Sequence, residues 1–142
     1  MTQPGLPAPS GPAPDRAGDA PVVLVVPADP AYLAVLRTAS AGLAARLDLD
    51  LDEIEDLRIA VDEASTLLIL GADHGDRLRA EFRLADDELD ITVSGPSTEL
   101  PERASIAWAV LEALAGEVVA HTGTDGAPSS VRLTHRRRRS RP

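Results

Sequence analysis

One segment near the middle of the chain constrains the fold more than any other. Its apolar residues recur at alternating steps of three and four, which places their side chains on one face of an α-helix: Ile54, Leu57, Val61, Ala64 and Leu68. Asp50 and Glu53 form a capping-box pattern at its start, and Gly71 is a natural stop. Because a helix with one apolar face must bury that face, this segment predicts a helix that packs against a second layer.

The segments on either side alternate between strand and helix patterns. Asp29 and Pro30 mark the start of another predicted helix, which continues to Leu47, and a third is expected from about Glu102 to Ala115. Aliphatic and alternating runs predict five strands, at residues 22–26, 78–84, 89–94, 118–121 and 131–134. This order predicts an α+β two-layer sandwich, in which a mostly antiparallel sheet is covered on one face by three helices and largely solvated on the other.

The composition changes at both ends of the chain. Residues 1–20 are rich in proline and glycine, so we expect a disordered leader, followed by one folded domain over residues 21–135. Residues 136–142 contain five arginines and predict a basic disordered tail. Residues 1–134 hold nine arginines against twenty-three acids, a net charge of −14. Because an acidic body repels nucleic acid, any nucleic-acid contact is expected only through the tail, whose other interpretation is a simple solvated end.

Several classes of site are excluded by residues that the chain lacks. It has no cysteine, which excludes disulfides, thiolate metal sites and a cysteine nucleophile, and it has neither lysine nor asparagine. The three histidines, His74, His121 and His135, stand too far apart to suggest a metal site, so none is expected. The apolar runs are too short to span a bilayer, and the first twenty residues contain no secretory pattern. We therefore expect a cytoplasmic protein with no membrane partner.

In this order of elements, one segment resembles the N-box helix of the RsbW-type anti-sigma regulatory factors. It is Asp56-Leu57-Arg58-Ile59-Ala60-Val61-Asp62-Glu63-Ala64. These proteins belong to the GHKL superfamily of ATPases and kinases, and the resemblance covers roughly residues 20 to 135. It implies a GHKL or Bergerat-like fold and a cytoplasmic homodimer. It also implies a protein that binds a sigma factor, keeps it from RNA polymerase, and releases it when a STAS-domain antagonist competes. Many members of the family also use Mg-ATP to phosphorylate that antagonist.

The N box of the family is only half matched. The resemblance gives Glu63 the role of the acid that activates the attacking group. The asparagine that would hold Mg²⁺ is replaced by Leu67, which has no lone pair to offer a hard cation, and only a carboxylate such as Asp62 is left to take over. The alternative interpretation makes Glu63 an ordinary residue on the flank of an amphipathic helix.

The two other ATP-binding boxes of the family are also degraded. Gly95 stands where the family has the aspartate that binds the adenine amino group, and Ser97 stands at the following glycine. Ser105 and Ala107 replace the two glycines whose bare backbone would cradle phosphate at a helix start. Because three boxes are degraded together, we expect lost catalysis and no bound cofactor. ATP and Mg²⁺ are expected only if the chain is a kinase after all.

The resemblance also places a partner contact on the helix that begins near Asp29. An arginine in the register R-x-x-x-x-x-x-x-x-x-L-D contacts sigma factor and antagonist in the family, and Arg37, eleven residues before Asp48, falls in it. The acidic companion one turn earlier is not matched, because Leu33 stands there. The other interpretation of Arg37 is an exposed helix residue near Asp29 or another acid.

Other residues that invite a functional interpretation have ordinary structural ones. Trp108 is expected to be a core or interface anchor rather than a platform for stacking bases. His74 is expected in a surface loop, and residues 123–126 are expected to form a turn rather than a phosphate loop.

These observations lead to two main functional hypotheses. The first is a binding protein, an anti-sigma pseudokinase in stress-response transcription whose nucleotide handling is weak or lost. The alternative is an ATP-dependent Ser/Thr kinase that phosphorylates the antagonist, with Glu63 as the base. A third hypothesis is a stand-alone α+β domain with a different regulatory partner.

Overall fold

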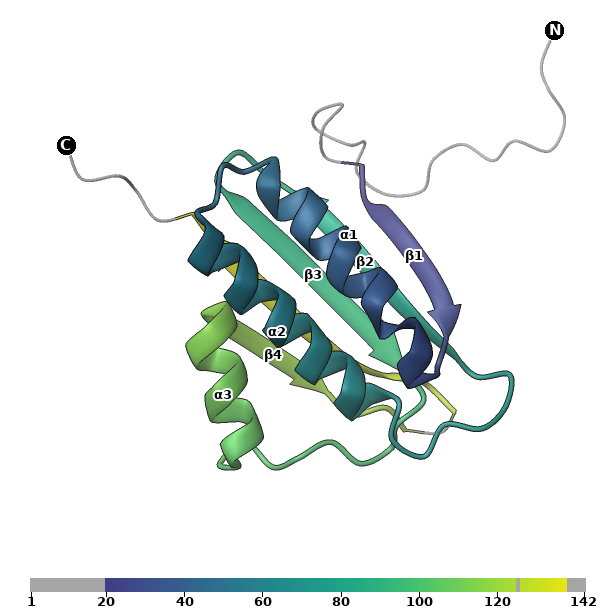
Figure 1. Ribbon diagram of the computed structural model, residues 1–142. Helices are drawn as coiled ribbons and strands as arrows, with labels where there is room; N and C mark the ends of the chain where they lie inside the picture. Colours follow the sequence, from purple (N-terminus) through teal and green to yellow (C-terminus); the bar gives the residue numbers. More distant parts are fainter. Residues whose placement is uncertain (1–19, 125, 138–142) are drawn as a thin grey trace, which may run out of the picture.

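The order of helices and strands in the computed structural model follows the sequence pattern. The structure describes residues 20–124 and 126–137. Within these residues the elements are β1 (Val22–Pro27), a short 3-10 helix η2 (Pro30–Tyr32), α1 (Leu33–Ala45), α2 (Leu51–Leu68), β2 (Arg77–Leu84), β3 (Glu88–Gly95), α3 (Ile106–Ala115), β4 (Glu117–His121) and β5 (Ser129–Arg136). Figure 1 shows the helices in front of the sheet.

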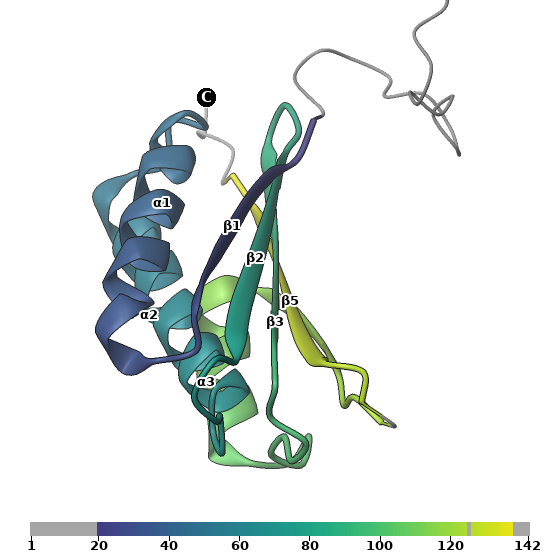
Figure 2. The same ribbon diagram turned by 90° about the vertical axis from the view of Figure 1, so that its right-hand side faces the viewer.

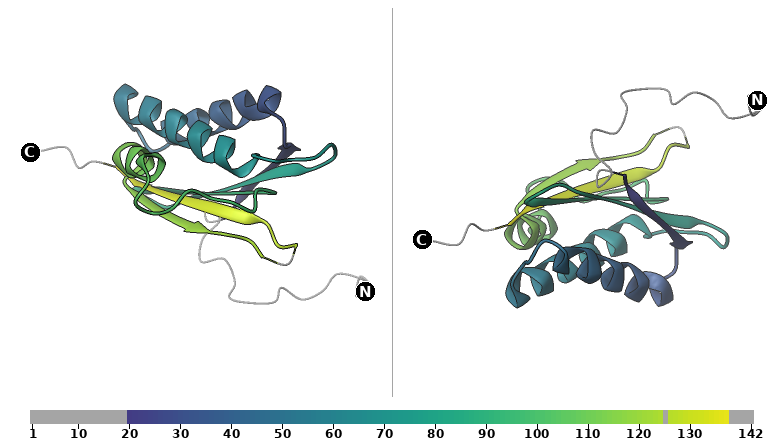
Figure 3. Two further views of the ribbon diagram at one scale, coloured as in Figure 1. Left: turned by 90° about the horizontal axis from the view of Figure 1, so that it is seen from below. Right: turned by 90° about the horizontal axis from the view of Figure 1, so that it is seen from above.

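The described strands form one sheet in the order β1-β2-β3-β5-β4, and every neighbouring pair is antiparallel. β1 and β4 are therefore its two edges. The three α-helices lie on one face of this sheet, as the views from the side and along the layers show (Figures 2 and 3). The α+β two-layer sandwich predicted from the sequence is confirmed.

The core lies between the sheet and the helices. Alternate residues of the inner strands are buried there, such as Phe82 on β2, Ile91 on β3 and Leu133 on β5. They pack with the apolar faces of the helices, where Leu57 of α2 and Trp108 of α3 are also buried. Burying a side chain of this size stabilises the fold by roughly 1.5–3 kcal/mol. The indole N–H of Trp108 donates to the carbonyl of Pro101, so Trp108 is a core anchor, as predicted.

The helix starts confirm one prediction and correct another. The capping box of α2 is present: the backbone N–H of Glu53 donates to Oδ1 of Asp50 at 2.8 Å, and that of Asp50 donates to Oε2 of Glu53 at 3.0 Å. The third helix, however, begins at Ile106 rather than at Glu102. Ser105 is the N-cap and has an extended backbone, while its N–H closes a turn by donating to the carbonyl of Glu102 at 2.9 Å.

The predicted leader and tail fall almost entirely outside the described residues. Ala20, Arg136 and Arg137 are the exceptions, and β5 runs on past the predicted strand end at Thr134 to Arg136. Arg136 pairs with Glu88 on β3 at 3.5 Å, and the N–H of Arg137 donates to the carbonyl of Asp87. β5 therefore extends by one residue into the predicted tail. No helix among the described residues is long and apolar enough to cross a membrane.

Candidate functional site

The positions that match two of the nucleotide boxes meet where α2 ends. Leu67 is half-buried in the last turn of α2, and the carbonyl of Leu68 accepts a hydrogen bond from the N–H of Ser97 at 2.9 Å. Gly95 is buried at the end of β3, two residues before Ser97. The structure thus brings Leu67, Gly95 and Ser97 to one place. We call these residues, with Leu68, the closed end of the sheet.

Gly95 lets α2 lie directly on β3. A Cβ atom at this position would lie 2.6 Å from the carbonyl oxygen of Leu68, 2.9 Å from the Cβ of Leu68 and 3.0 Å from the Cδ1 of Leu78. Real Cβ atoms do not approach a backbone oxygen that closely, so any side chain at Gly95 requires α2 to move. The space in which the family's aspartate would stand is filled by the end of α2.

Ser97 uses its polar groups within the protein. The residue is only 3% exposed, and besides its bond to Leu68 its carbonyl accepts from the hydroxyl of Ser129 at 2.5 Å. Its hydroxyl exchanges hydrogen bonds of 3.3 Å with the backbone of Glu99. The Ser129 hydroxyl in turn accepts from the N–H of Gly123 at 2.9 Å. These bonds tie the loop after β3 to the segment between β4 and β5 and occupy polar groups of Ser97 and Ser129.

The third box lies at the start of α3. Ser105 caps the helix by its backbone geometry only, because its side chain makes no capping hydrogen bond and its Oγ is buried without a partner. Ala107 is half-buried, and Ile106 between them is 83% exposed. With Cβ atoms on both former glycines, this segment is an ordinary helix start rather than a bare phosphate cradle.

The residues at these positions do not fit Mg-ATP. Within residues 20–124 and 126–137, no group of three or more histidines, aspartates or glutamates is arranged to hold a metal ion. Leu67 offers no ligand, and Gly95 leaves no room for a carboxylate. The structure therefore supports no chemical step through a bound nucleotide at the closed end. The role of Glu63, which is exposed on α2, stays a prediction.

A second group of predicted residues lies on the outer face of the helices. Nη1 of Arg37 donates to Oδ1 of Asp62 at 2.9 Å, which joins α1 to α2 next to Glu63. The two paired side chains remain 38% and 32% exposed. Arg37 therefore pairs with an acid, which is Asp62 rather than Asp29. α1 and α2 run side by side (Figure 1). We call the residues Arg37, Asp62, Glu63 and the exposed Ile59 on these two helices the helix face.

Sequence reasoning missed one buried pair at the start of α2. Nε2 of His135 lies 3.6 Å from Oε1 of Glu53, and the two residues are 9% and 3% exposed. Glu53 was found through its capping box, whereas His135 was considered only as a metal ligand. Its position two residues after the buried Leu133 on β5 is the signal that could have placed it on the helix side of the sheet.

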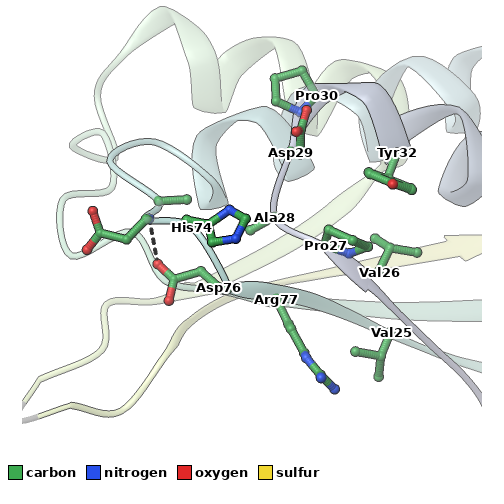
Figure 4. A pocket seen from close by; sticks show the side chains of 13 residues that line it. Val25, Val26, Pro27, Ala28, Asp29, Pro30, Tyr32, His74, Asp76 and Arg77 are labelled. Carbon is green, nitrogen blue, oxygen red and sulfur yellow. Dashed lines mark hydrogen bonds between the residues drawn. The ribbon is translucent and has the colours of Figure 1, made fainter.

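A cavity of about 800 Å³ lies away from these residues, where β1 ends and the α2–β2 loop returns (Figure 4). His74 is an exposed loop residue at its rim, as predicted. The polar groups of Asp76 hold the loop itself: its side chain accepts from the N–H of Asp73 at 2.8 Å and its carbonyl from the N–H of Ala28 at 2.9 Å. This cavity is built from chain turns and supplies no set of converging functional groups.

Comparisons with known proteins agree with this fold. No model of a known protein family matches the chain. It is 36% identical over 76 residues to the serine-protein kinase RsbW of Bacillus subtilis, an alignment of 51% of this chain and 48% of that protein. It is 34% identical over 87 residues to serine-protein kinase RsbW of Listeria innocua, covering 58% and 55%. The chain spans about half the length of the curated relatives it matches.

The fold is also similar to a solved structure. The crystal structure of the RsbU and RsbW domains of Rv1364c from Mycobacterium tuberculosis superposes with a TM-score of 0.63 at 20% identity, covering 85% of this chain and 33% of that one. This likeness concerns the fold. Together the comparisons confirm the resemblance that the N-box helix and the order of elements suggested.

Proposed function

We propose that the chain, which is similar to the RsbW-like proteins of the GHKL superfamily in sequence and in fold, is an anti-sigma factor that acts by binding alone. In this proposal it is cytoplasmic, sequesters a sigma factor, and gives it up to a STAS-domain antagonist. The observation that carries the proposal is the close approach of Leu68 to Gly95, because it leaves no room for the family's adenine-binding carboxylate at this position, while the helix face lies elsewhere on α1 and α2.

Binding alone is sufficient for sequestration. A sigma factor held on the protein is withheld from RNA polymerase by occupancy, which needs a complementary surface and no chemical step. The helix face offers such a surface. Arg37 is half-exposed, and its planar guanidinium can donate hydrogen bonds to a second carboxylate beside Asp62. If sigma factor and antagonist both use this arginine, they exclude each other, which gives release by competition.

A kinase remains the second candidate, and the names of the relatives favour it. Both relatives described above are named serine-protein kinases. In that case Glu63, exposed on α2 beside the Arg37–Asp62 pair, would accept the proton of an attacking serine hydroxyl. This candidate has to work without the family's adenine-binding carboxylate, since a Cβ at Gly95 would lie against the backbone of Leu68.

Co-purification of the full chain from its native cells, with identification of the bound proteins, tests the proposal. We expect a sigma factor, and we expect the complex to inhibit transcription in a reconstituted assay without ATP. The candidate antagonist is then incubated with the chain and labelled Mg-ATP. Transfer of label to the antagonist that is lost in Glu63→Ala would establish the kinase and reject binding alone. Co-purification of an unrelated regulator would reject both candidates.

The homodimer that the resemblance implies stays a prediction at this point.

A further inference from the structure

The helix α3 has the composition of a buried helix, although only one of its faces is buried. Its ten residues are all apolar except Glu112. Its buried face consists of Trp108, Leu111 and Ala115. A helix that is apolar on every side is usually enclosed by protein, whereas a surface helix carries polar residues on its outer face. α3 therefore lacks the polar outer face of an ordinary surface helix.

The exposed residues of α3 form one continuous apolar stripe. Four exposed residues lie opposite the buried face, at helical spacings of three, four and seven: Ile106, Ala109, Val110 and Ala113. Ile106 is 83% exposed and Val110 is 40% exposed. α3 lies beside α2 at the margin of the molecule (Figure 1), and the part of the chain that the structure describes leaves these side chains uncovered. We call these four residues the α3 stripe.

The shape of the α3 stripe fits a second helix. Ile106 and Val110 stand one turn apart and form a ridge, and the small Ala109 and Ala113 form a lower row beside it. Side chains of a facing helix can lie over the two alanines, which is the ridges-into-grooves arrangement of packed helices. A β-strand partner would instead need a free sheet edge, which a helix does not offer. The occupant that fits this surface is a helix with an apolar stripe of its own.

Charges around the α3 stripe select the kind of helix. Residues 99–117 contain four glutamates and one arginine, a net charge of −3. Glu112 is exposed on α3 itself, and Glu102 is exposed just before the helix begins. A second copy of the chain, or an anionic lipid surface, would bring like charges together here. A helix whose apolar stripe is flanked by lysine or arginine brings opposite charges together, which favours binding.

We propose that the α3 stripe is a docking site for a basic amphipathic helix of another protein. In this complex Ile106 and Val110 pack against apolar residues of the partner helix, and Glu102 and Glu112 attract its basic residues. The site uses no residue of the helix face or of the closed end. The proposal therefore goes beyond the anti-sigma function and does not depend on it.

A synthetic peptide is the probe for this site. It is a labelled helix of about 15 residues, built from leucine and lysine, with the leucines at spacings of three and four. One matched peptide has glutamate in place of lysine, and a second has the same composition with the leucines spread around the helix. Binding to the full chain is measured by fluorescence anisotropy. We expect the lysine peptide to bind with a micromolar dissociation constant, and both matched peptides to bind at least roughly tenfold more weakly.

Neutral substitutions in the chain locate the site without changing its charge. Ile106→Gln with Val110→Gln should raise the dissociation constant of the lysine peptide by roughly tenfold or more. Leu51→Gln is the matched control, because Leu51 is 80% exposed and opens α2 as Ile106 opens α3. Ile59→Gln tests the helix face, and both controls should stay within about twofold. Circular dichroism confirms folding, and Ile106→Gln alone serves if the double variant disturbs α3.

Four outcomes would overturn the proposal. One is a lysine peptide that does not bind at about 100 μM. Another is equal binding to the wild type and the folded double variant, or a loss confined to Ile59→Gln, because either places the peptide elsewhere. Equal affinity for the glutamate peptide would reject a basic partner. A wild-type dimer that dissociates in the double variant, measured by sedimentation, would assign the α3 stripe to a second copy. None of these outcomes decides whether the chain binds a sigma factor.

Discussion

The closed end of the sheet and the helix face share α2 but differ in how their polar groups are used. At the closed end, Gly95 touches Leu68, and Ser97 bonds only to other parts of the chain. On the helix face, Arg37 and Asp62 form one ion pair and remain about one-third exposed. Residues that are buried and hydrogen-bonded to other parts of the chain contribute to stability. Residues that are exposed and have N–H groups left to donate can bind a partner. In the proposed function, this contrast lets the domain bind a partner through the helix face without a nucleotide at the closed end.

The largest expected effect is the loss of nucleotide affinity at the closed end. Each missing charge-assisted contact at Leu67, Gly95 and Ser105 removes on the order of 1.5–3 kcal/mol of binding free energy. Calorimetry with Mg-ATP should therefore show no saturable heat in the micromolar range, on the order of 6 kcal/mol weaker than an intact site. Micromolar affinity for Mg-ATP that is lost in Glu63→Ala would contradict this prediction and the difference drawn between the closed end and the helix face.

The next effect is on folding stability. Gly95→Asp restores the family's carboxylate, but it places a Cβ and a charge against the backbone of Leu68. We expect the free energy of unfolding to fall by about 3 kcal/mol, measured by urea denaturation. Gly42→Ala is the matched control, since a Cβ there meets nothing within 4 Å and removing a helical glycine adds about 0.5–1 kcal/mol. Equal midpoints of urea denaturation for Gly95→Asp and the wild type would show that α2 can move away from Gly95 without loss of stability.

On the helix face, the expected effect is on binding rather than on stability. Arg37→Ala should weaken binding of the co-purified partner by roughly 1–3 kcal/mol, because an interfacial arginine is a frequent hot spot. Its loss leaves Asp62 half-exposed, so the unfolding free energy should change by less than about 1 kcal/mol. Arg58→Ala is the control, because Arg58 is similarly exposed and pairs with Glu55 on α2. Equal binding by both variants would move the docking surface away from α1.

The smallest effect on folding stability is expected on the open face of the sheet. This face serves as a reference for the closed end and the helix face. Nε of Arg132 donates to both carboxylate oxygens of Asp90 at 2.9 Å, and this hydrogen bond, with the attraction of the charge, raises the pKa of Arg132. Arg132 is exposed, so Arg132→Ala should cost less than about 1 kcal/mol of stability.

The pH dependence of the stability that the Arg132–Asp90 pair contributes follows from the direction in which the pKa of Arg132 is shifted. A raised pKa of a basic group stabilises the fold below its pKa in the unfolded chain and loses this effect only as the pH rises through the folded value. For Arg132 that loss lies above the ordinary pH range, so the difference between wild type and Arg132→Ala should be flat on the alkaline side of neutrality. A steep change in denaturation midpoints between pH 7 and pH 9, roughly, would contradict this assignment.

Local patterns in the sequence were sufficient to predict every helix and strand of the sandwich. The repeat from Ile54 to Leu68 and the capping box at Asp50 act within a few residues of chain, so they specify α2 without knowledge of its neighbours. The start of α3 was missed by four residues because Ser105 as N-cap and the turn at Glu102 compete locally with helix formation.

The contacts that distinguish the two regions join residues far apart in the chain. Gly95 meets Leu68, Arg37 meets Asp62 and Ser129 meets Ser97 across separations of 25 residues or more. Periodicity assigns an element and its buried face, but it does not state which turn of a helix rests on which residue of a strand, because that is decided by close packing of the whole core. By the resemblance, the sequence places Gly95 where the family has an aspartate. Only the tertiary structure decided that the glycine is required there, by bringing the carbonyl of Leu68 into the space that a side chain would occupy.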